Sequence, residues 1–319
     1  MTSAKPGPGR PRSRGLLAVA VVVVLALVAV LAVRLSGAGG PAVLSTAPGS
    51  WLGVYEKGPP DTYQPVAGFT QAVGRQPNLA GYYGGWGEPF KTSFARTARD
   101  HGAATLLQWD PTGASLAAIA AGHDDAYLRS FAASVRSFGG PVVIGFGHEM
   151  NAWWYTWGYR HTSPTVFKAA WRHLVTLFRS ARADNVTWLW TLQADEKGTG
   201  PVGKWWPGAS YVTWVGIDGY YYRPGDSFFS VFGTTIGQVR TFTGKPILLS
   251  EVAAGQVAGQ AAKIPGVFAG MRQYGTLGLV WFDIGQDDGL YHQDWHLEGD
   301  PAAVAAFGRA AAGLKLARP

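Results

Sequence analysis

Cysteine is absent from the 319 residues. Its absence excludes disulfide bonds, a thiolate nucleophile and any metal site built on thiolates. The sequence also lacks a Gly-x-Ser-x-Gly elbow, a Walker phosphate loop and a dinucleotide fingerprint. A His-Glu-x-x-His zinc protease is excluded as well, because Ala152 occupies the place of the second histidine. With no such motif present, we expect neither a metal nor a cofactor.

The chain has little net charge once its first 50 residues are set aside. Five of the 27 basic residues and none of the 20 acidic residues lie there, which leaves 22 basic against 20 acidic residues in the remainder. Nucleic-acid-binding domains carry clustered positive charge, so no nucleic-acid partner is expected. A remainder of ~270 residues buries enough surface to fold without disulfides, and we expect a monomer.

An unbroken apolar run of 18 residues extends from Leu16 to Val33. It is long enough to cross a membrane and longer than the usual apolar core of a signal peptide. The basic residues before it predict a cytoplasmic tail at residues 1–15, a transmembrane signal anchor at 16–34, a small-residue linker at 35–50 and an extracellular domain at 51–319. Small residues at 36–40 also permit cleavage, which would give a secreted protein instead.

The stretch from Pro141 to Gly158 joins an apolar strand to a polar, aromatic loop. Residues 142–146 are continuously apolar, which favours a strand covered on both faces, as in parallel sheets. His148 and Glu149 follow at its carboxyl end, where parallel barrels carry their functional residues. The pattern predicts a carboxyl group delivered into an aromatic site.

Strand-like and helix-like segments alternate along the rest of the chain. Strands are predicted at residues 51–55, 79–83, 103–109, 142–146, 186–193, 211–218, 246–250 and 277–282. Helices are predicted at residues 92–101, 124–138, 163–182, 228–242, 260–274 and 301–316. Eight strands alternating with helices predict an α/β fold, a (β/α)8 TIM barrel preceded by the single N-terminal membrane helix.

The sequence His-Glu-Met-Asn at residues 148–151, followed by two tryptophans and a tyrosine at 153–155, resembles the acid/base motif of glycoside hydrolase family 26. This is the β-mannanase and lichenase family, and the resemblance extends from Trp51 to Phe307. It implies that Glu149 is the general acid/base. It also implies that Glu251, which directly follows an apolar strand, is the nucleophile.

The resemblance and the strand-end positions add candidate substrate-binding residues. Tyr220 is implied to donate its hydroxyl to the nucleophile, and His148 to contact sugar hydroxyls or the nucleophile. Asn151 lies two residues after the acid and is predicted to hydrogen-bond a sugar hydroxyl, whereas Asp218 is predicted to accept a hydrogen bond without catalysing. Flat rings at strand ends are predicted to stack on pyranose rings: Trp109, Trp154 and Trp281.

Two positions depart from the family pattern. Many mannanases of the family carry an arginine four residues before the acid/base glutamate and another after the tryptophan of the last strand. Here these places hold Gly145 and Phe282. Both replacements remove positive charge from the floor of the predicted site.

The resemblance implies a retaining, endo-acting hydrolase of a β-linked polysaccharide, β-mannan or mixed-linkage β-glucan. Its partners would be that polysaccharide and the membrane. Two other functions use the same features. A membrane-tethered carbohydrate-binding barrel would keep the aromatic residues without turnover, and a transglycosylase of surface glycans would use both glutamates with a sugar acceptor. The presence of both Glu149 and Glu251 favours an enzyme.

Overall fold

The computed structural model describes residues 1–4, 44–194, 199–286 and 292–319. By its contacts the chain divides into Met1–Pro41 and Ala42–Pro319. The predicted membrane helix at 16–34 lies outside the described residues, and none of the helices within them is long and apolar enough to span a bilayer. Residues 44–50, predicted as the end of a linker, pack on the barrel domain through the buried Leu44.

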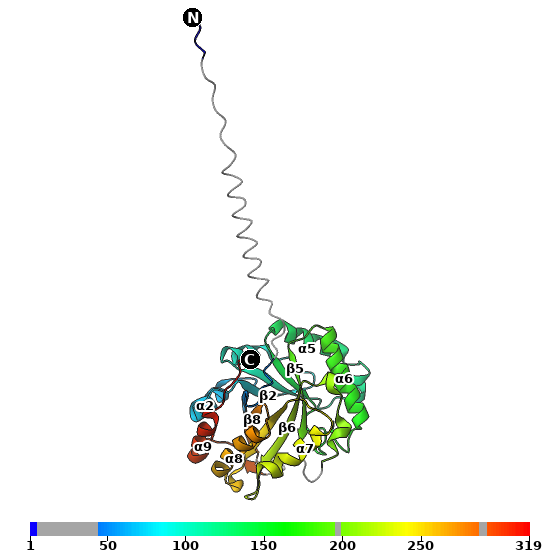
Figure 1. Cartoon of the computed structure of the whole chain (residues 1–319). Coiled ribbons are helices and arrows are strands. Elements are labelled where there is room, and N and C mark those ends of the chain that lie inside the picture. Colours follow the sequence, from blue (N-terminus) through cyan, green and yellow to red (C-terminus); the bar gives the residue numbers. More distant parts are fainter. Residues whose placement is uncertain (5–43, 195–198, 287–291) are drawn as a thin grey trace. The chain divides into compact units, whose positions relative to one another are not determined.

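Eight parallel strands close into a barrel within the described part of the chain (Figure 1). Each strand pairs with the next, and the first pairs with the eighth. The predicted (β/α)8 architecture is therefore confirmed. The strands are β1 (Trp51–Glu56), β2 (Leu79–Gly85), β3 (Ala104–Asp110), β4 (Val142–Phe146), β5 (Val186–Gln193), β6 (Trp214–Tyr221), β7 (Ile247–Ala254) and β8 (Gly278–Asp283).

The strands form because nearly all of their residues are apolar and become buried, inside the barrel or under the helices. Gly278 opens β8 with a φ of 152° where β8 meets β1. A Cβ atom there would lie 1.8 Å from the carbonyl oxygen of Trp51, so no other residue fits without displacing the backbone. Barrel closure thus depends on one glycine.

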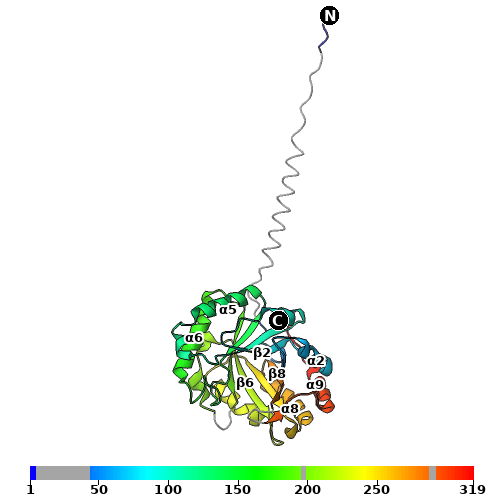
Figure 2. The same cartoon turned by 180° about the vertical axis from the view of Figure 1, so that it is seen from behind.

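Helices surround the strands (Figure 1). They are α2 (Gln64–Val73), α3 (Thr92–Asp100), α4 (Leu116–Ala120), α5 (Asp125–Phe138), α6 (Pro164–Ser180), α7 (Thr234–Arg240), α8 (Gln260–Gln273) and α9 (Pro301–Ala312). The last helix lies beside α2 in both views, which joins the end of the barrel domain to its beginning (Figures 1 and 2). Sequence patterns missed α2 and α4, and the helix predicted at 228–242 begins with a π-helical turn, Phe229–Gly233.

Two strands end three or four residues later than predicted, and the difference affects the site. β6 continues to Tyr221 and β7 to Ala254, so Asp218, predicted at a strand end, and Glu251, predicted after one, both lie inside strands. The register of β7 shifts by one residue against both neighbours between Leu248 and Val252. Such a bulge bends a strand and re-aims its side chains. Here it falls on the segment that contains Glu251.

Candidate active site

Glu149 follows β4 in a backbone conformation that non-glycine residues rarely adopt, with a φ of 52°. Its N–H donates to the carbonyl of Thr191 on β5, and its carbonyl accepts from Ala152, so the turn is held on both sides. The side chain is 5% exposed. Strained backbone that the surroundings hold in place is common at functional sites. The turn directs this carboxyl group toward the barrel axis.

Glu251 and Ser250 occupy the bulge in β7. The Ser250 hydroxyl donates to Oδ1 of Asp218 on β6, at 2.5 Å. Glu251 is paired in register with Asp218 and is 4% exposed. In a regular strand successive side chains point to opposite faces. The bulge instead lets two successive residues reach groups on the inner side.

The barrel brings three carboxyl groups together. One oxygen from each of Glu149, Asp218 and Glu251 lies within 4.8 Å of the others. Burial, followed by the charges of the two glutamates, raises the pKa of Asp218 well above its ordinary value. Asp218 accepts a hydrogen bond from Ser250, as predicted for a residue that supports the site. Three such oxygens could also reach one cation, but hydroxyl and indole groups already donate to each residue.

Two tyrosines donate to Glu251. The hydroxyl of Tyr83 on β2 lies 2.5 Å from Oε1, and the hydroxyl of Tyr220 on β6 donates to Oε2. The predicted contact of Tyr220 is therefore confirmed. Burial and the charge of Glu251 raise the pKa of both phenols well above 10, so they stay protonated as donors. Burial raises the pKa of Glu251, whereas His148 and the two phenols lower it.

His148 is buried between Asp110 and Tyr155. Its Nδ1 lies 2.9 Å from Oδ1 of Asp110, and its Nε2 lies 2.9 Å from the Tyr155 hydroxyl. Burial lowers the pKa of His148, but the charge and hydrogen bond of Asp110, together with the charges of Glu149 and Glu251, outweigh this effect and raise the pKa to about 9. The imidazole is therefore a cation at neutral pH. It acts on Glu251 through its charge and not through the predicted hydrogen bond.

Three tryptophans of the loop after β4 have different surroundings. Trp154 donates its indole N–H to Oε2 of Glu149 at 2.8 Å and is half-buried, so it lies in the site as predicted. Trp157 donates its indole N–H to the carbonyl of His148 and stacks on Tyr155, and these two contacts hold the loop in place. Trp153 is 41% exposed. The loop thus offers one ring to the carboxyl group and one to solvent.

Two predicted stacking platforms are wrong. Trp109 is buried between β3 and the helices, where its ring stacks on Phe131 of α5 with 4.0 Å between centroids. Trp281 is buried on the outer side of β8 and meets Phe307 of α9 edge-on at 5.3 Å. Neither ring has a free face for a sugar. Both belong to the packing between barrel and helices.

The prediction for Asn151 is also wrong. Its Oδ1 accepts from the backbone N–H of Gln193, and its Nδ2 donates to the carbonyl of the same residue. The side chain is fully buried. This amide pair ties the loop after β4 to the end of β5, because it completes the β5 backbone hydrogen bonds. Asn151 therefore positions the loop that carries Glu149 and does not face a substrate.

The two departures from the family pattern have physical explanations. A Cβ atom on Gly145 would lie 1.9 Å from Oε1 of Gln108, so the amide of Gln108 fills the space that a larger residue would need. Phe282 is a buried residue of β8, and its ring meets the Tyr220 ring edge-on with 5.6 Å between centroids. Both positions are uncharged, and each lies directly against a polar residue, Gln108 or Tyr220.

Sequence patterns missed three functional residues. Tyr83 donates to Glu251, and Asp110 and Tyr155 each hydrogen-bond to His148. Asp110 and Tyr83 stand at the carboxyl ends of β3 and β2, so a search of every strand end for polar groups would have found them. Tyr155 carries no such signal, because its contact depends on the fold of the loop.

The fold and the site thus combine a closed parallel barrel with two neighbouring glutamates, one on the turn after β4 and one in β7, and paired carboxyl groups are what glycosidases use. The family model described as glycosyl hydrolase family 26 matches residues 127–298, more than half of the chain. The chain belongs to glycosyl hydrolase family 26. The resemblance carried by residues 148–155 is thereby confirmed.

Similar proteins agree with this membership. Endoglucanase H of Acetivibrio thermocellus is 26% identical over 277 residues, which cover 81% of this chain and 29% of that protein. A modular endo-β-1,4-mannanase from Cellulomonas fimi has a similar structure, with a TM-score of 0.64 and 16% identity over 85% of this chain and 72% of its own. A family 26 β-mannanase from Bacteroides ovatus gives a TM-score of 0.57 and 14% identity, covering 84% and 88%. The chain spans less than a third of the length of the curated relatives it matches.

Proposed function

We propose that this barrel is a retaining, endo-acting glycoside hydrolase that cleaves a β-linked polysaccharide, either β-mannan or mixed-linkage β-glucan. The observation that carries the proposal is the pair of glutamates, whose nearest carboxyl oxygens lie within 4.8 Å of each other. Retaining glycosidases hold their carboxyl groups about 5–5.5 Å apart, whereas inverting enzymes need a wider gap for a water molecule. The names of the endoglucanase and the mannanases support the substrate class.

In this proposal the two glutamates have different roles. Glu149 protonates the glycosidic oxygen while Glu251 attacks the anomeric carbon, which breaks the sugar–oxygen bond and forms a glycosyl-enzyme ester. Glu149, now ionised, then takes a proton from water as the water displaces Glu251. The indole of Trp154 donates to only one oxygen of Glu149, Oε2. It fixes the orientation of the acid in both steps.

The groups around Glu251 support its role as an ionised nucleophile. Two phenols donate to its oxygens, and the cationic His148 favours the charged carboxylate. Glu149 is the member of the pair that carries the proton in this proposal, and the Trp154 indole N–H donates to its Oε2. A bell-shaped dependence of kcat/KM on pH is therefore expected, with Glu251 responsible for the acid limb and Glu149 for the basic limb.

The product configuration tests the mechanism. Proton NMR of freshly released reducing ends, from mannan and from mixed-linkage glucan, is expected to show the β-anomer first. An initial α-anomer would refute the retaining mechanism. Product sizing in the same reactions is expected to show oligosaccharides of several lengths, as endo action requires. Release of monosaccharide alone would argue for exo action.

Variants of the acid test the assignment of roles. Glu149→Ala is expected to lose far more activity on polysaccharide than on an aryl glycoside with a good leaving group, because only the polysaccharide needs protonation. Equal losses on both substrates would show that Glu149 is not the acid. Glu88→Gln is the matched control, since Glu88 is an exposed residue paired with Lys91.

The two alternatives give different results in these assays. A carbohydrate-binding barrel would retain polysaccharide without releasing reducing ends. A transglycosylase would convert added oligosaccharide acceptors into longer products faster than it releases sugar to water. The hydrolase is favoured because a binding protein has no need of two buried, hydrogen-bonded glutamates.

We also propose that the barrel is held on the outer face of the cell membrane. The support is the apolar run at residues 16–33 with its basic flank. Activity is then expected to stay with washed membranes, and protease cutting between residues 37 and 43 is expected to release it. Mass spectrometry of the native protein decides between anchoring and secretion, because a mature N-terminus within residues 36–50 would indicate a cleaved signal peptide.

A further inference from the structure

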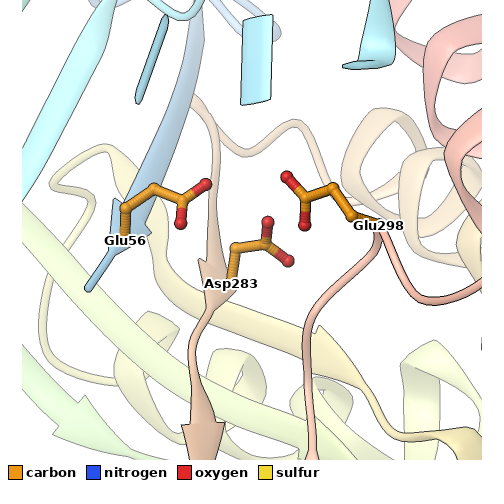
Figure 3. Close-up of side chains that lie close together, drawn as sticks. All are labelled: Glu56, Asp283 and Glu298. Carbon is orange, nitrogen blue, oxygen red and sulfur yellow. The ribbon is translucent and has the colours of Figure 1, made fainter. Parts of the chain in front are cut away.

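A second group of three carboxyl groups lies apart from the glutamate pair. Glu56 at the end of β1, Asp283 at the end of β8 and Glu298 just before α9 point toward one another (Figure 3). One oxygen from each lies within 4.8 Å of the others. Glu56 and Asp283 are in register on paired strands, and Oδ1 of Asp283 accepts from the backbone N–H of Leu297, which brings Glu298 close.

The group contains buried oxygens that accept no hydrogen bond from outside the group. Asp283 is fully buried, and its Oδ2 has no donor; Oε1 of Glu56 is likewise buried without one. Among the described residues, none of the salt bridges joins any of the three to a basic side chain. Buried carboxyl oxygens without a partner are costly, so the arrangement requires a positive group or shared protons.

The crowding of like charges has a large effect on these groups. Burial, with the charges of Asp283 and Glu298, raises the pKa of Glu56 to about 10. Burial and the charge of Glu298 raise the pKa of Asp283 to about 8. A divalent cation among the three would remove this repulsion by binding the charged forms. The alternative is that protons alone neutralise them.

We propose that Glu56, Asp283 and Glu298 bind one calcium ion. All three ligands are carboxylates, the donor type that Ca²⁺ prefers, and no histidine or thiolate among them favours zinc. Ca²⁺–oxygen distances are about 2.3–2.6 Å, so oxygens on opposite sides of the ion are separated by up to about 5 Å. The observed limit of 4.8 Å allows one such ion to reach all three. Water molecules and second carboxylate oxygens would complete the usual six to eight ligands.

A calcium ion here would tie the segment before α9 to the barrel. Trp295 of this segment lies against the ring of Tyr220, with 5.0 Å between centroids. Tyr220 in turn donates to Glu251. The ion would therefore stabilise the segment that packs against Tyr220, the residue that donates to the candidate nucleophile Glu251. Its binding is a property of the chain separate from glycoside hydrolysis, and its test uses no polysaccharide.

Calorimetric titration of the full-length protein with CaCl2, after removal of divalent cations by EDTA and dialysis, tests the site directly. One Ca²⁺ per chain is expected, together with a rise in the melting temperature that saturates with the same dissociation constant. Mg²⁺ is expected to bind at least tenfold more weakly. Absence of saturable Ca²⁺ binding up to about 10 mM, beyond the range of extracellular calcium modules, would overturn the proposal, as would equal affinity for Mg²⁺.

Variants locate the ion. Asp283→Asn keeps the oxygen that accepts from Leu297 and is expected to weaken Ca²⁺ binding at least tenfold. Glu298→Gln should have the same effect, and because Glu298 is exposed this variant folds even if the first does not. Asp184→Asn, an exposed residue before β5 at the other end of the barrel, should bind Ca²⁺ like the wild type. Unchanged affinity in Glu298→Gln, or equal weakening in Asp184→Asn, would exclude this site.

Discussion

Replacement of Tyr83 by phenylalanine tests how the candidate nucleophile is kept ionised. The Tyr83 hydroxyl donates to Oε1 of Glu251 at 2.5 Å, and this hydrogen bond lowers the pKa of a carboxyl group that burial raises. Phenylalanine keeps the ring that stacks on Tyr55, with 4.8 Å between centroids, and removes only the donor. The pKa of Glu251 is therefore expected to rise.

The size of the effect follows from the kind of hydrogen bond. A hydrogen bond to a charged group contributes about 1.5–3 kcal/mol, and one pKa unit corresponds to about 1.36 kcal/mol. The pKa of Glu251 is thus expected to rise by about 1–2 units in Tyr83→Phe. Because the nucleophile must be ionised, the acid limb of kcat/KM moves to higher pH by the same amount. Activity on the plateau falls less, since Tyr220 still donates to Oε2.

The assay is kcat/KM against pH on an aryl glycoside, where protonation of the leaving group does not limit the rate. Tyr82→Phe is the matched control. Tyr82 is the preceding residue of β2 and faces the helices, where its ring meets Phe94. It should leave the acid limb in place. An unchanged acid limb in Tyr83→Phe would refute the reasoning, whatever happens to the overall rate.

Three further substitutions test the surroundings of the site. Asp110→Asn is expected to remove about 3 kcal/mol of stability that the raised pKa of His148 supplies. In the wild type this stabilisation is present below about pH 6.5 and is lost as the pH rises through about 9. The free energies of urea unfolding of wild type and variant should therefore converge at high pH, and a difference that is constant with pH would contradict the prediction. Gly145→Ala is expected to lower the free energy of unfolding by about 1–3 kcal/mol, because the added methyl group overpacks against Gln108. The double variant with Gln108→Ala should recover part of this loss. Strictly additive effects of the two substitutions would show that residues 145 and 108 do not collide. Trp281→Ala is expected to lower the free energy of unfolding by about 3–5 kcal/mol. A change in KM without any loss of stability would instead indicate that the Trp281 ring contacts the substrate.

The barrel and the position of its glutamates could be predicted from the sequence, because both depend on local patterns. Continuous apolar runs identify buried parallel strands. The carboxyl ends of such strands meet at one end of the barrel, so Glu149 and Glu251 were expected to lie together. The positions at which the strands end were harder to predict. Polar residues such as Asp218 ended the apolar pattern, although the strand continued to Tyr221 because the inside of this barrel holds a polar cluster.

The wrong predictions for tryptophans have a common cause. A position near the end of a strand does not say which face the side chain occupies, because successive residues alternate. Gln108 donates to Thr191 across the barrel interior, so its neighbour Trp109 must face the helices. Phe282 lies inside beside Tyr220, so Trp281 must face outward. An inward-facing reference residue on each strand would have corrected both predictions.

The donor Tyr83 and the bulge could not be predicted for Glu251, for a different reason. Its donors come from β2 and β6, and its bulge is defined only by pairing with the strands on both sides. The calcium site that we propose has the same character. Residues 56, 283 and 298 are brought together by barrel closure and show no ligand spacing in the sequence. Motifs with fixed spacing are informative only where one loop supplies the ligands.

The absence of the two family arginines affects how Glu251 is kept ionised. With Gly145 and Phe282 in their places, positive charge near Glu251 comes from His148, and that charge depends on Asp110. An arginine stays charged at every relevant pH, whereas an imidazolium does not. The ionised state of Glu251 is therefore supported by a group that itself loses its proton near pH 9. On the roles we propose, loss of the proton from His148 is expected to raise the pKa of Glu251, because burial is then opposed only by the hydrogen bonds from Tyr220 and Tyr83.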